Sequence, residues 1–216
     1  MVTSSPAIEE YLQAIYTLSD EGTNVIGARL AAFIGVSAAA VSEMVHRLER
    51  DGLVELDGHK EVHLTNKGQA LADHVVRRHR LAERMLVDLL GYEWWKTHEE
   101  AERIEHAMSP EMEERLIRVL GDPQTCPHGN PMPGAKPRPT KPLEKVERGA
   151  TATIERIPDQ FEHEPGFLHY LDTQGLRPGV AVRVLDPRHG EPLRVEVEGR
   201  ERSIRADCGQ KVWVRA

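Results

Sequence analysis

The chain has 216 residues and a formal net charge of −7, and 39% of its residues are hydrophobic, which suits a globular protein with more than one packed unit. The negative charge disfavours a protein that holds nucleic acid by general positive charge, so any DNA contact needs a local arrangement. The first residues lack a leader pattern and no apolar run reaches membrane-spanning length, so we expect a cytoplasmic protein without membrane contact.

The first part of the chain predicts two helices joined by a tight turn. Apolar residues recur at helical spacing from Ile8 to Leu18, which predicts a first helix. A short second helix over residues 26–34 ends at Gly35, and Ser37 is placed to cap a third helix that ends near residue 51. Two helices separated by a glycine turn predict a helix-turn-helix.

A β-hairpin and three further helices are predicted next. Strand-like runs over residues 53–56 and 61–64 flank an Asp57-Gly58 pair, which favours a hairpin turn, and a hairpin behind a recognition helix is a wing. The three helices cover residues 66–90, 95–107 and 110–120.

The composition changes after these helices. Residues 126–142 contain six prolines and two glycines, which predicts an irregular linker. Five short β-rich runs follow, and so many strands in so short a segment predict a small closed or nearly closed barrel. The fold class is therefore mostly α with a β-rich C-terminal domain. The predicted domains are residues 1–66, residues 67–125, a linker over 126–147, and residues 148–216.

Histidines and glutamates gather on two of the predicted helices. His98, Glu102, Glu105 and His106 share one helical face. His79 and Glu83 stand one turn apart on the preceding helix. Inward-facing carboxylates cost several kcal/mol unless they are neutralised, so we expect a metal site. Solvated surface charges remain the alternative for any single pair.

The donor set indicates which metal fits. Glu10 on the first helix is a candidate fourth ligand beside Glu102, Glu105 and His106, which makes an oxygen-rich set with one nitrogen and no sulfur. Such a set favours Mn(II) or Fe(II) over Zn(II). Cys126 and Cys208 fit no paired ligand spacing, so we expect two free thiols.

Enzymatic metal patterns are absent from the sequence. The segment His98-Glu99-Glu100-Ala101-Glu102 lacks the second histidine of a metalloprotease helix. No pair of Glu-x-x-His helices marks a di-iron bundle. We therefore expect a protein that is not an enzyme.

At this point the chain resembles the diphtheria-toxin-repressor family of metal-dependent repressors, including its manganese-responsive branch. The resemblance is strong in the helical part and weak in the β-rich tail. It rests on residues 9–16, 41–42, 47–54, 79–84, 105–109 and 129–134. It implies a winged helix-turn-helix, a helical domain for metal binding and dimerisation, and an SH3-like domain of the FeoA type.

The resemblance also implies two metal ions per chain. His79, Glu83 and His98 match the family's ancillary site, while Glu105 and His106 match its primary site. The primary site takes a further ligand at the position of Glu10.

Two positions depart from the iron-responsive branch. Carboxylates stand at Glu10 and Glu102, where that branch has sulfur ligands, so manganese is favoured over ferrous iron. Gln13 replaces a carboxylate of the manganese branch, which leaves open whether the two sites are bridged. In the SH3-like domain, Glu162 is a candidate ancillary ligand, and Glu164 is a further candidate in the same stretch.

The third helix is the candidate recognition helix. Its small, weakly polar surface predicts that much of the specificity comes from DNA shape. The candidate base-reading residues are Ser37, Ala39, Ala40, Ser42 and Glu43, and the candidate phosphate-binding residues are Arg29, Arg47, Arg50 and Lys60.

These features together predict a metal-dependent repressor. We expect it to bind palindromic operator DNA as a homodimer when loaded with Mn(II) or Fe(II), and to control genes of manganese or iron homeostasis. The rival hypothesis is a winged-helix regulator that senses a small organic ligand, and it predicts that chelation leaves DNA binding unchanged.

Overall fold

The computed structural model describes residues 5–136, 138–186 and 192–215. It forms two compact units: the first comprises residues 1–79 and 104–108, and the second comprises residues 80–103 and 109–216. The chain passes from the first unit to the second within α4 (Asn66–Arg84), returns within α5 (Thr97–Glu105), and enters the second unit again after Met108.

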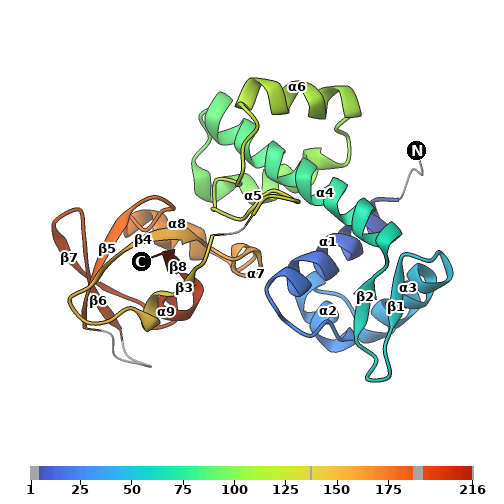
Figure 1. Ribbon diagram of the computed structural model, residues 1–216, viewed down its shortest axis with the longest axis horizontal. Helices are drawn as coiled ribbons and strands as arrows, with labels where there is room; N and C mark the ends of the chain where they lie inside the picture. The colour runs from blue at the N-terminus through green and yellow to red at the C-terminus, as the bar shows by residue number, and fades with distance from the viewer. Residues whose placement is uncertain (1–4, 137, 187–191, 216) are drawn as a thin grey trace. The chain divides into compact units, whose positions relative to one another are not determined.

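The first unit is a winged helix-turn-helix, as predicted (Figure 1). α1 packs on α2 and on β2, and the core between them contains Leu12, Ile15, Leu30 and Leu48, all fully buried. Its elements ahead of α4 are α1 (Pro6–Asp20), α2 (Gly27–Ile34), α3 (Ala38–Arg50), β1 (Val54–Leu56) and β2 (Val62–Leu64).

The turn between α2 and α3 follows the capping chemistry expected from the sequence. Gly35 ends α2 with φ 78°, a left-handed conformation that glycine adopts without a steric penalty. The Ser37 hydroxyl accepts a hydrogen bond from the backbone N–H of Ala40 at 3.2 Å, which satisfies one of the open donors of α3. The helix-turn-helix is therefore fixed by local residues.

The wing is an antiparallel hairpin in which Val54 faces Leu64 and Leu56 faces Val62. Its turn is held by the Asp57 carboxylate, which accepts hydrogen bonds from the N–H groups of His59 (2.8 Å) and Glu61 (2.9 Å). The residue of this turn with a left-handed backbone is Lys60, at φ 60°, and not Gly58 of the Asp57-Gly58 pair. This conformation places Lys60 at the exposed tip of the wing.

The helical part of the second unit departs once from the predicted helices. The long helix loses regular α geometry after Arg84 and ends in a π-helical turn, η1 (Met85–Leu89). A 3₁₀ turn, η2 (Trp94–Lys96), leads into α5. α6 (Pro110–Leu120) starts as predicted, because the Ser109 hydroxyl accepts from Met112 N–H at 3.2 Å.

The β-rich part of the second unit is an antiparallel sheet with strand order β3-β8-β4-β5-β6-β7 (Figure 1). Five strands lie at or beside the predicted runs, although β7 starts three residues before the run predicted over 203–206, and β3 is added to them. The strands are β3 (Lys141–Pro142), β4 (Thr151–Arg156), β5 (Ala181–Asp186), β6 (Leu193–Val197), β7 (Arg200–Ile204) and β8 (Trp213–Arg215). Val182, Val184, Val195 and Val197 fill its core with no exposed surface.

Short helices interrupt this sheet at places where the sequence predicted none. They are η3 (Leu143–Lys145), α7 (Asp159–Glu162), α8 (Phe167–Thr173) and α9 (Cys208–Lys211). Each is too short to produce a repeating apolar pattern, which is why periodicity missed them. α7 matters most, because Glu162 stands at its end.

Among the described helices, none is long and apolar enough on its own to cross a membrane. α2 and α3, bent by 112° relative to each other, pass that test only as a pair. Both contribute to the core of the first unit through Leu30, Val41 and Leu48.

Candidate metal centre

The first unit gathers two carboxylates and two imidazoles, which we call the first-unit cluster: Glu9, His79, Glu105 and His106. His79 Nδ1 lies 2.5 Å from Glu105 Oε2. His106 Nδ1 lies 2.7 Å from Glu9 Oε2, and its Nε2 lies 3.4 Å from Glu105 Oε1. His106 therefore joins the end of the α5 segment to a carboxylate on α1.

The carboxylate that α1 contributes to this cluster is Glu9. Its side chain is 10% exposed and also lies 3.4 Å from the Arg78 guanidinium. Glu10, the predicted ligand, is exposed in the structure. Leu12 marks the buried face of α1, and an α-helix turns by about 100° per residue. Glu10 lies two residues before Leu12 and is turned by about 200°, away from the buried face. Glu9 lies three residues before Leu12, and its turn of about 300° brings it back close to that face. Helical periodicity offered this signal for Glu9.

The second unit contains a fully enclosed group, the buried cluster: Glu83, His98, His128 and Glu162. His128 Nδ1 lies 3.1 Å from Glu83 Oε1 and 3.2 Å from Glu162 Oε2. His98 Nδ1 lies 3.6 Å and 3.1 Å from the same two oxygens. Ligands bound at about 2.1 Å in a tetrahedron lie about 3.4 Å apart, so each of these four separations suits a pair of ligands on one divalent ion.

Residues from four segments bring the buried cluster together. Glu83 lies on α4 and His98 on α5, while Glu162 ends α7 and His128 belongs to the proline-rich segment. The His128 side chain is fixed because its Nε2 donates to the Trp94 carbonyl at 2.9 Å. The His128 carbonyl accepts from the Ile157 N–H at 2.9 Å, which ties this segment to the chain just before α7. His79, a further predicted ligand, stands one turn before Glu83 on α4.

Asn130 positions Glu162 within the buried cluster. Its side-chain amide donates to the Glu162 Oε1 atom and to the Ile157 carbonyl, both at 2.7 Å. The amide leaves Glu162 Oε2 directed at the two histidines. A hydrogen-bonded carboxylate of this kind is the usual support for a metal ligand.

The electrostatics of the buried cluster are those of charges that neutralise one another. Burial by itself would raise the pKa of Glu162, but His128 and His98 lower it to about 2. Burial opposes protonation of the two histidines, yet the surrounding carboxylates outweigh it and raise both pKa values well above the usual range. In the metal-free protein, protonated imidazoles thus supply the positive charge that a bound cation would otherwise bring to the carboxylates.

Sequence reasoning missed His128 and the neighbouring Cys126. The Cys126 Sγ atom lies 4.0 Å from His128 Nδ1, and Glu83, Cys126 and His128 place ligand atoms within 4.8 Å of one another. Both cysteines are free, as expected, and burial raises the pKa of the Cys126 thiol to about 12. The available signal was the Cys126-Pro127-His128 triplet, which we assigned only to a linker.

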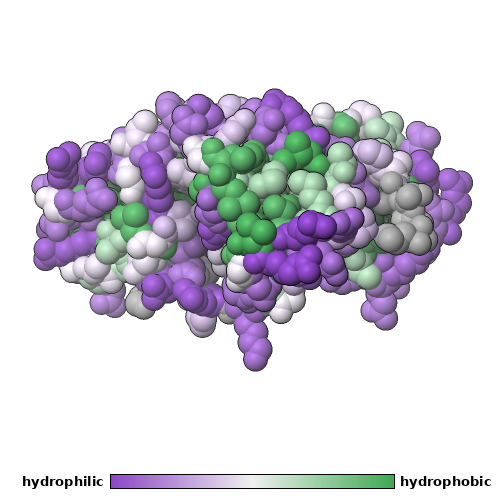
Figure 2. Space-filling view, turned by 90° about the horizontal axis from the view of Figure 1, so that it is seen from above, coloured by the Kyte–Doolittle hydropathy of each residue, from purple (hydrophilic) through white to green (hydrophobic). Residues whose placement is uncertain are grey.

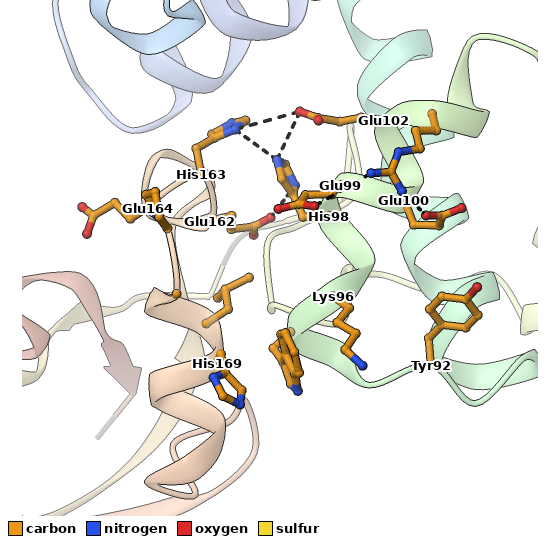
Figure 3. A pocket seen from close by; sticks show the side chains of 15 residues that line it. Tyr92, Lys96, His98, Glu99, Glu100, Glu102, Glu162, His163, Glu164 and His169 are labelled. Atoms are coloured by element: carbon orange, nitrogen blue, oxygen red, sulfur yellow. Dashed lines mark hydrogen bonds and ion pairs between the residues drawn. The ribbon is translucent and has the colours of Figure 1, made fainter.

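Glu102 lies near two histidines of the second unit (Figure 3). Its Oε1 atom is 3.4 Å from His98 Nε2 and 3.9 Å from His163 Nδ1, and its side chain is 49% exposed. Glu164 instead forms an ion pair with Lys211 at 2.5 Å. This contact gives Glu164 a structural role without a metal.

The predicted DNA-reading face lies on the exposed side of the first unit. Val41, Val45 and Leu48 of α3 point into the core. All nine predicted DNA-binding residues are exposed: Arg29, Ser37, Ala39, Ala40, Ser42, Glu43, Arg47, Arg50 and Lys60. Two of the arginines have contacts within the chain, since Arg29 donates to the Asn24 carbonyl at 2.8 Å and Arg47 lies 4.0 Å from Asp51.

Three family models match successive parts of the chain. Residues 4–62 match the N-terminal DNA binding domain of iron dependent repressors, and residues 65–134 match their metal binding and dimerisation domain. Residues 141–216 match the FeoA domain. The three matched segments coincide in turn with the winged helix-turn-helix, the helical part and the β-rich part.

Individual relatives agree with these models. The chain is 50% identical over 126 residues to the iron-dependent repressor IdeR of Mycobacterium tuberculosis, a match that covers 58% of this chain and 55% of that protein. It is 39% identical over 189 residues to the diphtheria toxin repressor of Corynebacterium efficiens, covering 88% of this chain and 68% of the relative. The chain thus spans little more than half the length of the mycobacterial relatives that it matches.

Solved structures show the same similarity over nearly the whole chain. A manganese-dependent transcriptional repressor in complex with manganese is 36% identical, with a TM-score of 0.87 over 97% of this chain and 99% of that one. The manganese regulator SloR is 32% identical, with a TM-score of 0.77 over 98% and 99% of the two chains.

Proposed function

The chain belongs to the iron-dependent repressor family, and we propose that it is a metal-dependent transcriptional repressor that binds operator DNA as a homodimer. The observation that carries this proposal is the link between Glu9 of α1 and His106 in the first-unit cluster. α1 packs in the core of the helix-turn-helix, so this cluster adjoins the DNA-reading domain directly.

We propose two metal ions per chain, one at the first-unit cluster and one at the buried cluster. The first-unit cluster offers two carboxylates and two imidazoles and no sulfur, a donor set suited to Mn(II) and, second, to Fe(II). A bound divalent ion supplies positive charge and a fixed ligand geometry. Glu9 lies at His106 Nδ1 and Glu105 at His106 Nε2, so the His106 ring or a carboxylate has to turn before both carboxylates share one ion with it.

The proposed metal switch acts by fixing the position of α1 and of the helix-turn-helix packed on it. With a metal bound, Glu9, Glu105 and His106 would fix α1 to the residues at the end of α5, and α1 would fix the helix-turn-helix packed on it. A helix-turn-helix that is already ordered loses less conformational freedom when it binds DNA. Two divalent ions would also reduce the formal charge from −7 to about −3, which weakens repulsion from phosphate.

The exposed face of α3 would read the operator mainly through its shape. The Ala39 and Ala40 methyl groups suit contact with a thymine methyl, and Glu43 suits a cytosine amine. These few contacts give limited base discrimination, so we propose that sequence-dependent DNA deformability supplies much of the specificity.

Apolar side chains exposed on the second unit support the homodimer. Figure 2 shows apolar residues gathered on the face seen from the side of α6. Large apolar side chains of this unit that remain exposed are Leu89 (47%), Leu90 (60%), Tyr92 (41%), Met112 (40%) and Val119 (65%). An exposed apolar area of this kind indicates a protein interface, and a two-fold dimer calls for a palindromic operator.

The decisive experiment measures binding of the metal-stripped protein to its own upstream DNA, titrated with Mn(II), Fe(II) and Zn(II). Glu9→Gln and Glu10→Gln form a matched pair, because they remove adjacent carboxylates from the same helix. We expect metal to tighten DNA binding by roughly 5–150-fold in the wild type. Loss of that gain in one variant identifies the ligand that α1 supplies.

Equally tight DNA binding in chelator would overturn the metal switch. The winged-helix regulator that senses a small organic ligand would then replace it. The order of potency among the three metals separates manganese from ferrous iron, and the target genes of manganese or iron homeostasis follow from the promoters that the loaded protein occupies.

A further inference from the structure

A second group of ligand atoms opens to solvent beside the buried cluster, which we call the exposed triangle: His98 Nε2, Glu102 Oε1 and His163 Nδ1 (Figure 3). The two histidine nitrogens are 3.2 Å apart. Glu102 Oε1 lies 3.4 Å from the first and 3.9 Å from the second. All three residues belong to the second unit and face a cavity of about 410 Å³.

The size of the triangle suits a metal ion. A triangle with these sides has one point about 2.1 Å from all three atoms, the usual length of zinc–nitrogen and zinc–oxygen bonds. The cavity leaves room for water to complete the coordination. His163 is 36% exposed and Glu102 49% exposed, so an ion has direct access from solvent.

His98 is already oriented for this second role. Its Nδ1 atom lies 3.1 Å from the buried carboxylate of Glu162, while Nε2 points at the triangle. A metal-binding histidine commonly donates its other ring N–H to a carboxylate, which fixes the tautomer and raises the basicity of the ligating nitrogen. Glu162 is therefore in position to support His98 as an Nε2 ligand.

We propose that His98, Glu102 and His163 form a third, solvent-accessible site for a borderline divalent cation such as Zn(II). Two nitrogens and one carboxylate oxygen make a softer donor set than the two carboxylates and two imidazoles of the first-unit cluster, so the site prefers Zn(II) to Mn(II). A neutral imidazole offers one lone pair. When Nε2 binds at the triangle, the buried cluster keeps Glu83, His128 and Glu162.

The test compares His163→Gln with His169→Gln in the full-length, metal-stripped protein. His169 lines the same cavity but packs against Trp95 at a tilted angle, with ring centroids 4.3 Å apart, and takes no part in the triangle. Zn(II) and Mn(II) are titrated in competition with a chromophoric chelator. Wild type and His169→Gln should bind one more equivalent of Zn(II) than His163→Gln, at least tenfold more tightly than Mn(II) at that site.

Equal Zn(II) stoichiometry and affinity in all three proteins would overturn the site, and an equal or greater Mn(II) affinity there would overturn the assigned cation class. Because the comparison is a difference of one equivalent and needs no DNA, it is independent of the proposed repressor activity. If His163→Gln fails to fold, ¹⁵N resonances of the Zn-loaded wild type decide. If the spectra show that His98 binds zinc through Nε2 and carries its proton on Nδ1, the site is supported. If the proton is on Nε2, the site is overturned.

Discussion

The first-unit cluster and the buried cluster use the same side-chain types in different surroundings. Glu9, Glu105 and His106 join helices of the DNA-reading unit, and His106 remains 27% exposed. In the buried cluster, by contrast, Glu83, Glu162 and His128 have at most 1% of their side chains exposed. Because the buried cluster is enclosed, its charges have to neutralise one another for the fold to be stable. The first-unit cluster contains the partly exposed His106 and contacts α1, so it is suited to pass a metal signal to the DNA-binding helices.

This difference separates two kinds of metal effect. Removing a ligand from the buried cluster leaves carboxylates enclosed without full compensation, so folding stability should suffer first. Removing the partly exposed His106 from the first-unit cluster should cost less stability and uncouple metal from DNA, whereas Glu9, His79 and Glu105 are themselves buried.

The largest effect is expected for His128→Ala. The substitution removes the imidazole that lies within 3.2 Å of both Glu83 and Glu162, and breaking a buried charge pair costs about 3–5 kcal/mol. Urea denaturation should show this loss in the metal-free protein. His46→Ala, at a 68% exposed side chain, is the control and should stay within about 0.5 kcal/mol of wild type. A similar small loss in both variants would remove the distinction between the clusters.

Glu105→Gln should instead act on the coupling between metal and DNA. The amide keeps the shape of the side chain but binds metal more weakly than the carboxylate that contacts His79 and His106. We expect the metal-dependent gain in operator affinity to fall by about tenfold or more, with basal stability changed far less than in His128→Ala. Fluorescence anisotropy with operator DNA, at fixed salt and with Mn(II) or chelator, measures it. Full retention of the gain would exclude Glu105 as an activating ligand.

The buried cluster also predicts a pH dependence of the metal-free protein. The pKa of Glu162 is lowered to about 2, so its stabilisation is present above about pH 4.3 and is lost as the pH falls towards 2. The pKa values of His98 and His128 are raised, so their stabilisation is present below about pH 6.5 and is lost as the pH rises through the raised values.

Metal binding should follow the opposite trend at neutral pH. Ligands must shed their protons, so metal affinity should rise with pH while the stability of the metal-free protein falls. Denaturation with and without Mn(II) between about pH 6 and 9 tests both trends. Parallel curves for the two forms would show that the histidines are not protonated in the metal-free cluster.

The smallest effect is expected at the tip of the wing. Lys60→Asn removes a candidate phosphate contact while asparagine tolerates the positive φ at this position. The salt dependence of DNA binding should lose about one unit of slope, whatever the operator sequence. Lys145→Asn, at an exposed lysine of the second unit, should leave the slope unchanged. Equal slopes for wild type and Lys60→Asn would place the wing away from the phosphates.

Local signals in the sequence determined the winged helix-turn-helix. Gly35, Ser37 and the Asp57 turn act on neighbouring residues, so short-range rules were sufficient to place them. The candidate ligands on α4 and α5 were proposed on the same kind of evidence, because helical spacing puts them on one face. Glu9 was within reach of that rule as well, although the prediction chose Glu10.

Only the tertiary structure decided how the second unit completes its clusters. His128 and His163 come from irregular segments, and no periodic pattern relates them to His98 on α5. Their meeting depends on long-range contacts, such as His128 to the Trp94 carbonyl and Asn130 to Glu162. The sequence alone therefore determined the winged helix-turn-helix and proposed candidate ligands on the helices, while the packing of distant segments decided the enclosed cluster and the exposed triangle.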